Sequence, residues 1–112
     1  CGSSPQEARS RGCEFSMMDG RWLPSLCYDK ALDTSWMQRG WKYYEDSNGT
    51  KELTQQLIKT GDLSNFWVTT DYHRGHCQMG MDQLANRYME GTPVPSYIVE
   101  GEHVTHCLEM IT

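Results

Sequence analysis

Two copies of the pattern His-x-x-His-Cys carry the residues of this sequence that could do chemistry. The first copy spans residues 73–77 (HRGHC) and the second spans residues 103–107 (HVTHC), and together they hold all four histidines. Chance would produce two such copies with a probability on the order of 10⁻⁵. On a helix, residues i, i+3 and i+4 lie on one face, so each copy is expected to present two imidazoles and one sulfur together. The pattern predicts metal-ligating and catalytic roles for His73, His76, His103 and His106.

The identity of the metal depends on what accompanies the imidazoles, because imidazole binds zinc, copper, iron and nickel alike. A zinc hydrolase normally adds a third ligand and a general base, as in HExxH, and neither copy has that glutamate. A non-haem iron site needs a carboxylate, but Asp71 and Glu102 do not occupy equivalent positions beside the two motifs. Copper is therefore the favoured cofactor, with iron and zinc as alternatives.

The cysteine that closes each motif has two interpretations. As thiolates, Cys77 and Cys107 would be soft metal ligands, but on neighbouring helices in an oxidising compartment they would form a disulfide. We favour the disulfide, whose loss would cost about 2–5 kcal/mol. A second disulfide is expected between Cys13 and Cys27, which leaves Cys1 over because the chain has five cysteines.

Length and charge limit the class of protein. A chain of 112 residues is expected to form a single domain over residues 1–112. The net charge of -5, without a cluster of Lys and Arg, argues against nucleic acid as a partner. No apolar run approaches the roughly 20 residues that cross a bilayer, and the chain starts without an initiator methionine, so we expect a soluble piece of a longer protein. The cysteines and the sequon Asn48-Gly49-Thr50 favour a lumenal or secreted protein glycosylated at Asn48.

Two helices are expected to carry the motifs. The longer one begins at Thr69 or Thr70 and ends before Gly91, and the second covers residues 102–111. Pro93 and Pro95 interrupt the helical pattern, and the connection between the helices is long enough to bring the second motif beside the first. The two helices should therefore pack side by side.

The remaining elements are short. Residues 4–12, 25–32 and 55–59 are expected to contain helical turns, and residues 41–54 a hairpin that turns at residues 47–49. Aromatic side chains should supply most of the core, notably Trp36, Trp41, Tyr43 and Tyr44. The expected fold class is mainly α with a small β-hairpin, a small α+β fold stapled by disulfides.

Several segments besides the two motifs resemble the UstYa-like family of fungal secondary-metabolite biosynthesis oxidases. The resemblance rests on residues 1–9 (CGSSPQEAR), 12–15 (GCEF), 22–24 (WLP) and 27–29 (CYD), and with the motifs it covers nearly the whole chain. It implies copper-dependent oxidation of a peptide or small-molecule natural product, such as a mycotoxin precursor, by cyclisation, hydroxylation, desaturation or halogenation. It also implies a UstYa-like lumenal domain in the secretory pathway, anchored by one N-terminal membrane helix that lies outside this sequence.

Two classes of function follow from these expectations. In the first, the chain is a copper-dependent oxidoreductase whose four histidines bind the metal. In the second, it is a non-catalytic subunit, stapled by metal and disulfides, that supports an active relative, since members of the family can act as homo- or hetero-dimers. Redox turnover by the purified chain alone distinguishes the two classes.

Overall fold

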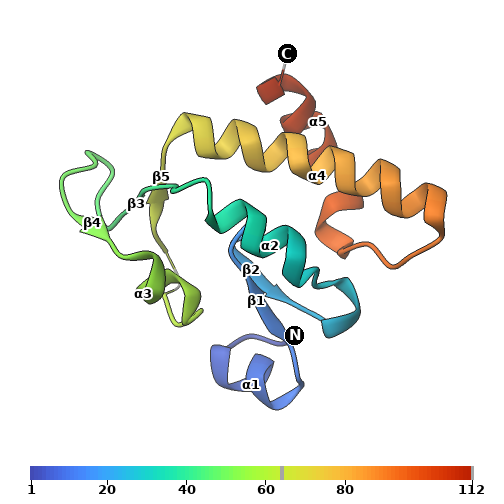
Figure 1. Cartoon of the computed structure of the whole chain (residues 1–112), viewed down its shortest axis with the longest axis horizontal. Coiled ribbons are helices and arrows are strands. Elements are labelled where there is room, and N and C mark those ends of the chain that lie inside the picture. Colours follow the sequence, from blue (N-terminus) through green and yellow to red (C-terminus); the bar gives the residue numbers. More distant parts are fainter. Residues whose placement is uncertain (64, 112) are drawn as a thin grey trace. The chain divides into compact units, whose positions relative to one another are not determined.

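The fold is mainly helical with small antiparallel sheets, as the sequence predicts. A computed structural model describes residues 1–63 and 65–111 (Figure 1). Its contacts divide the chain into two compact units, residues 1–69 and residues 70–112. The single domain over residues 1–112 stays a prediction. None of the helices described is both long enough and apolar enough to span a bilayer.

The first unit combines short helices with two small sheets. Its elements are α1 (Pro5–Ser10), β1 (Glu14–Ser16), β2 (Arg21–Leu23), η1 (Ser25–Cys27), α2 (Lys30–Met37), β3 (Tyr43–Tyr44), β4 (Glu52–Leu53), α3 (Gln55–Lys59) and β5 (Trp67–Val68). Strands β1 and β2 pair antiparallel, and β3 lies between β4 and β5. The expected hairpin is formed by β3 and β4, whereas the β1–β2 hairpin and β5 were not predicted.

Side-chain caps fix where the helices of the first unit begin. The hydroxyl of Ser4 accepts a hydrogen bond from the backbone N–H of Glu7, as expected for the start of α1. The side chains of Asp29 and Thr54 cap α2 and α3 in the same way. Each cap satisfies a backbone donor that the first helical turn leaves without a partner.

A buried carboxylate links three parts of the first unit. Asp33 of α2 is only 3% exposed and accepts hydrogen bonds from the backbone N–H groups of Met17 and Met18, at 3.1 and 2.9 Å. It also accepts a hydrogen bond from the Tyr28 hydroxyl at 2.9 Å and one from the Lys59 ammonium at 3.3 Å. Burial, and then this hydrogen bond to Asp33, raise the pKa of Tyr28 well above its usual range, so the phenol stays a donor. Asp33 therefore holds the turn between β1 and β2 against α2 and α3.

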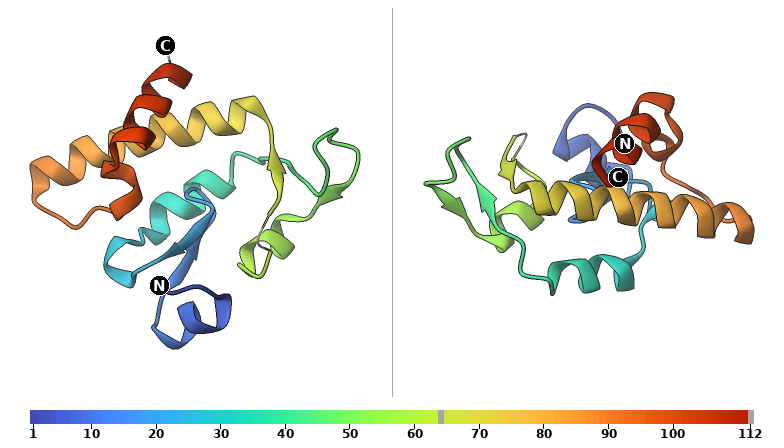
Figure 2. Two further views of the ribbon diagram at one scale, coloured as in Figure 1. Left: turned by 180° about the vertical axis from the view of Figure 1, so that it is seen from behind. Right: turned by 90° about the horizontal axis from the view of Figure 1, so that it is seen from above.

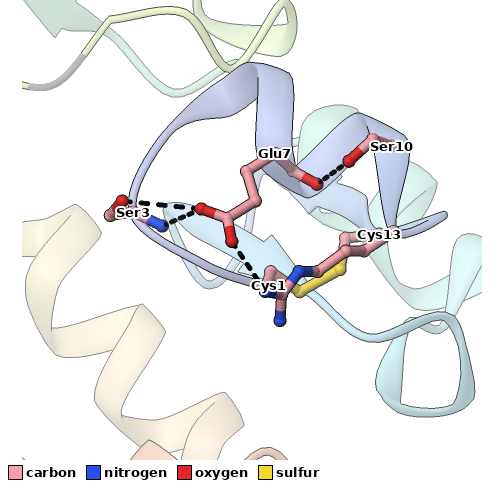
Figure 3. The surroundings of a disulfide bond; sticks show 6 residues. Cys1, Ser3, Glu7, Ser10 and Cys13 are labelled. Atoms are coloured by element: carbon pink, nitrogen blue, oxygen red, sulfur yellow. Dashed lines mark hydrogen bonds and ion pairs between the residues drawn. A yellow bond between two sulfur atoms is a disulfide. The ribbon is translucent and has the colours of Figure 1, made fainter.

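The N-terminal disulfide corrects the expected pairing of Cys13 with Cys27. Cys13 is bonded to Cys1, with their Cα atoms 6.2 Å apart (Figure 3). Cys27 is a buried free thiol. Helix α1 ends at Ser10, and Gly12, with φ of 74°, turns the chain so that the N–H of Cys13 donates to the carbonyl of Ala8. This turn brings Cys13 back towards the start of the helix, where Cys1 lies.

The core of the first unit is aromatic and sulfur-rich. Trp36 and Tyr43 are 0% and 1% exposed, as expected for core residues, whereas Trp41 and Tyr44 are only half-buried. The rings of Trp36 and Trp41 lie 5.0 Å apart. Met17 and Met18 fill the space beside Asp33 and are almost fully buried. The unit thus has an apolar core of its own.

The second unit consists of the two predicted helices and the turn between them. Helix α4 (Thr70–Glu90) leads through η2 (Ser96–Val99) into α5 (Gly101–Ile111). Both views in Figure 2 show α5 lying across α4, and η2 also contacts both helices. Pro95 precedes η2 and supplies the fixed φ with which this turn begins. The motif-bearing helices therefore pack side by side, as predicted.

Candidate metal centre

The centre of the second unit is a disulfide between Cys77 of α4 and Cys107 of α5. Both cysteines are fully buried, and their Cα atoms are 4.9 Å apart. The sequence favoured this bond over two free thiolates. Since each cysteine follows its histidines directly, the bond fixes the distance between the two histidine motifs.

The histidines form two pairs, and each pair joins one helix to the other. The first histidine of each motif meets the second histidine of the other: His73 lies beside His106, and His76 lies beside His103. The sequence predicted pairs within each motif, on one helix face. The two motifs therefore run in opposite directions where they meet, so the first histidine of one motif faces the second histidine of the other.

The pair formed by His73 and His106 has the spacing of two ligands on one ion. Their Nε2 atoms are 3.0 Å apart and their ring centroids 4.9 Å apart. Two imidazole nitrogens, each about 2.0–2.1 Å from a metal, lie about 3 Å apart when the angle at the metal is near 90–100°. Without an ion, the same spacing suits one N–H···N hydrogen bond between the rings. The distance between the two nitrogens is therefore compatible with a shared metal.

The electrostatics of this pair favour metal binding. Partial burial, and then the nearby His106, lower the pKa of His73. A lower pKa keeps the imidazole neutral, which is the form that donates a lone pair to a metal. His106 is exposed, whereas His73 is half-buried. The pair is therefore accessible to solvent from the α5 side.

The pair formed by His76 and His103 lies among aromatic rings. Its ring centroids are 6.1 Å apart, and the two planes are nearly perpendicular. The ring of His76 is parallel to those of Tyr72 and Tyr97, each 6.4 Å away. Tyr97, from η2, also packs edge-on against His103 at 4.9 Å. Tyrosine therefore positions both imidazoles of this pair.

Tyr97 is the residue that the sequence reasoning missed. It lies outside both motifs, in the connection between the two helices, for which the sequence predicted only a sufficient length. Its side chain is 7% exposed. Its position before the second motif indicated nothing about the ring contacts, which depend on how η2 folds back. Tyr72, which directly precedes the first motif, also lies beside His76, with the two ring centroids 6.4 Å apart.

The Tyr97 ring should be needed for tight metal binding, and its hydroxyl should not. Replacing Tyr97 with alanine removes the ring that positions His76 and His103, so we expect copper affinity to fall about 10–100-fold. The Tyr97→Phe variant keeps the ring and should retain both wild-type affinity and the wild-type electron paramagnetic resonance spectrum. A matched control is Ile98→Ala, which removes another buried side chain from the same turn. Equal copper affinity in Tyr97→Ala and the wild type would contradict the positioning role.

The two carboxylates considered as iron ligands, and the predicted glycosylation site, lie outside the imidazole pairs. Asp71 is exposed and lies 3.8 Å from the Arg74 guanidinium, and Glu102 is also exposed. Asn48 is exposed in the turn between β3 and β4, where the hydroxyl of Thr50 donates to Asp46. The sequon is therefore accessible to a glycosylating enzyme, in the first unit.

A third group in the second unit includes a sulfur. The ring nitrogens of His73 and His106 and the Sγ atom of Cys77 all lie within 4.8 Å of one another. In the disulfide, this sulfur has no thiolate charge to offer a metal.

The chain was compared with protein-family models, curated proteins and solved structures, and it matches none of them.

Proposed function

We propose that the chain is a copper-dependent oxidoreductase that acts on a peptide or small-molecule natural product, as the resemblance to UstYa-like oxidases implies. The observation that supports this function is the pairing of all four imidazoles across two disulfide-bonded helices. Copper is the cofactor that such a donor set suits, with iron and zinc as the alternatives. His73, His76, His103 and His106 are the proposed ligands and catalytic residues.

The donor set favours copper over the alternatives. Among the residues the structure describes, the metal-binding group at this site contains histidine and cysteine and no carboxylate. An iron site of the facial-triad type would need a carboxylate, and a zinc hydrolase would need a general base beside its ligands. Copper bound by imidazoles supplies a reversible one-electron change, which zinc does not have. Oxidation is therefore the reaction class that we propose.

The chain's own residues would divide the work between the two pairs. The exposed ring of His106 leaves the pair with His73 open to a substrate, whereas Tyr72 and Tyr97 cover the pair of His76 and His103. The buried disulfide keeps the two helices in register, so a bound substrate would meet imidazoles that are already positioned. Lowering of the His73 pKa keeps that ring available as a ligand near neutral pH.

We further propose that the protein works in the lumen of the secretory pathway. Two disulfides fit an oxidising compartment, and the exposed sequon at Asn48 fits glycosylation there. A membrane anchor would belong to a segment outside this sequence. To test this, the chain is expressed in a eukaryotic secretory host and analysed by gel electrophoresis before and after glycosidase treatment. We expect the glycosidase to increase the mobility of the unaltered chain and to leave that of the Asn48→Gln variant unchanged.

Oxygen consumption tests the proposed reaction. The oxidised chain is loaded with copper or with zinc and mixed with a reductant and candidate peptide or polyketide substrates. We expect oxygen uptake and a product of changed mass from the copper-loaded chain only. Equal product from the zinc-loaded chain would exclude redox chemistry, because zinc has no accessible redox change. Turnover that appears only after a related protein is added would instead favour the non-catalytic subunit.

A further inference from the structure

The sulfur of Cys77 lies where a third metal ligand would be. Its Sγ atom and the ring nitrogens of His73 and His106 are mutually within 4.8 Å, and the two Nε2 atoms are 3.0 Å apart. The three side chains come from both helices, with Cys77 one turn after His73 on α4. In the oxidised chain, the bond to Cys107 occupies this sulfur.

We propose that reduction of the Cys77–Cys107 disulfide opens a second mode of metal binding, in which the Cys77 thiolate joins His73 and His106 around one soft cation. Zinc and cuprous copper are the cations that two imidazoles and a thiolate suit. The reduction takes two electrons and two protons from a dithiol, which itself becomes a disulfide, and it yields two thiols. Metal binding then displaces the proton of Cys77 into solvent.

The distances fit a tetrahedral site with one open position. With metal–nitrogen bonds of about 2.0–2.1 Å and a metal–sulfur bond of about 2.3 Å, tetrahedral angles place the nitrogens about 3.3 Å apart and each nitrogen about 3.6 Å from the sulfur. The nitrogens are already 3.0 Å apart. The sulfur is at most 4.8 Å from either nitrogen, and rotation about the Cα–Cβ bond of Cys77 can close the remaining distance once the disulfide is broken.

The two cysteines differ in what surrounds them. Cys77 has imidazoles from both helices within reach, whereas the imidazole recorded beside Cys107 is that of His103, on its own helix, at 3.6 Å. Only Cys77 therefore completes a group of three ligands among the residues described. Removal of either cysteine destroys the disulfide equally, so the two single variants separate loss of the bond from loss of a ligand.

This second mode of metal binding is independent of the proposed oxidase activity. That function concerns the oxidised chain and four imidazoles, whereas the second mode concerns the reduced chain and needs only His73, Cys77 and His106. A chain that failed to oxidise any substrate would leave this inference untouched. Failure of the thiolate site would likewise leave the four-imidazole proposal untouched.

Cobalt(II), as a coloured substitute for zinc, provides the first test. Two variants are compared, Cys107→Ser and Cys77→Ser, and both also carry Cys27→Ser to remove the free thiol. Neither variant needs reductant, so the Cys1–Cys13 disulfide stays intact. We expect Cys107→Ser to bind about one equivalent with a thiolate-to-cobalt charge-transfer band in the near ultraviolet. The matched variant, Cys77→Ser, should lack the band. A band of equal intensity in both variants, or in neither, would overturn the proposal.

The second test keeps all five cysteines, in case the cysteine variants fail to fold. The disulfides are reduced with a dithiol, zinc is added or withheld, and accessible thiols are alkylated and mapped by peptide mass. We expect zinc to slow alkylation of Cys77 at least about tenfold relative to Cys107, and His73→Ala to abolish the protection. Alkylation of Cys77 at the same rate with and without zinc would overturn the proposal.

Discussion

Replacing His73 or His106 with alanine is expected to remove copper from the oxidised chain. The two Nε2 atoms are 3.0 Å apart, so each ring supplies half of the nitrogen donors at that position. Loss of an outer-sphere partner typically costs about 10–100-fold in metal affinity, and loss of a direct ligand should cost more than about 100-fold. Metal analysis after dialysis, together with electron paramagnetic resonance, measures the effect.

The matched control for this experiment is Gln78→Ala. Gln78 is exposed on α4, one residue after Cys77, and it lies outside both imidazole pairs. Its replacement should leave copper stoichiometry and the spectrum unchanged. His76→Ala extends the series: retention of about half of the copper would indicate one ion at each pair. Full stoichiometry in both His73→Ala and His106→Ala would rule out this assignment of ligands.

Replacing Asp33 with alanine is expected to destabilise the first unit by about 3–5 kcal/mol, a large share of the stability of a small domain. The change removes the acceptor for two backbone N–H groups, for the Tyr28 hydroxyl and for the Lys59 ammonium. Buried donors that lose their partner carry the full cost of desolvation. Lys59 also donates to the carbonyl of Phe15 at 2.8 Å and to the hydroxyl of Tyr28 at 3.2 Å, so its ammonium would keep two acceptors.

Urea unfolding followed by tryptophan fluorescence measures the loss, since all four tryptophans lie in the first unit. Asp29→Ala is the matched control, because Asp29 is an exposed aspartate of the same helix that caps only the N–H of Leu32. Loss of such a cap costs about 1 kcal/mol. Equal destabilisation by the two replacements would show that the Asp33 network adds nothing beyond one hydrogen bond.

The sequence predicts those features that depend on neighbouring residues. Ser4 and Glu7 are three residues apart, so the start of α1 is readable from local chemistry, and the same holds for α3 after Thr54. The spacing within each HxxHC motif places its ligands on one helix face, and the prolines mark the end of α4. These are short-range effects, and the structure contains the elements they predict.

Features that depend on distant residues could not be read in this way. The β1–β2 hairpin is held by Asp33, which lies 15 and 16 residues away from the amides that it binds. The pairing of Cys13 with Cys1 depends on the turn at Gly12, and several pairings were compatible with the sequence alone. The reversed order of the histidine pairs and the placement of Tyr97 depend on how α5 crosses α4. Tertiary packing, rather than residue type, determines each of these.

The disulfide between α4 and α5 would affect how quickly the proposed metal is captured and released. Both motifs belong to one chain, so the second binding step of the proposed metal is intramolecular with or without this bond. The bond keeps the two helices together, so an ion held by one helix would meet the imidazoles of the other at an effective concentration on the order of millimolar or higher. An ion that lost one ligand would therefore be recaptured before it could diffuse away. We expect the residence time of the proposed metal to depend on the sulfur–sulfur bond as well as on the strength of each metal–nitrogen bond.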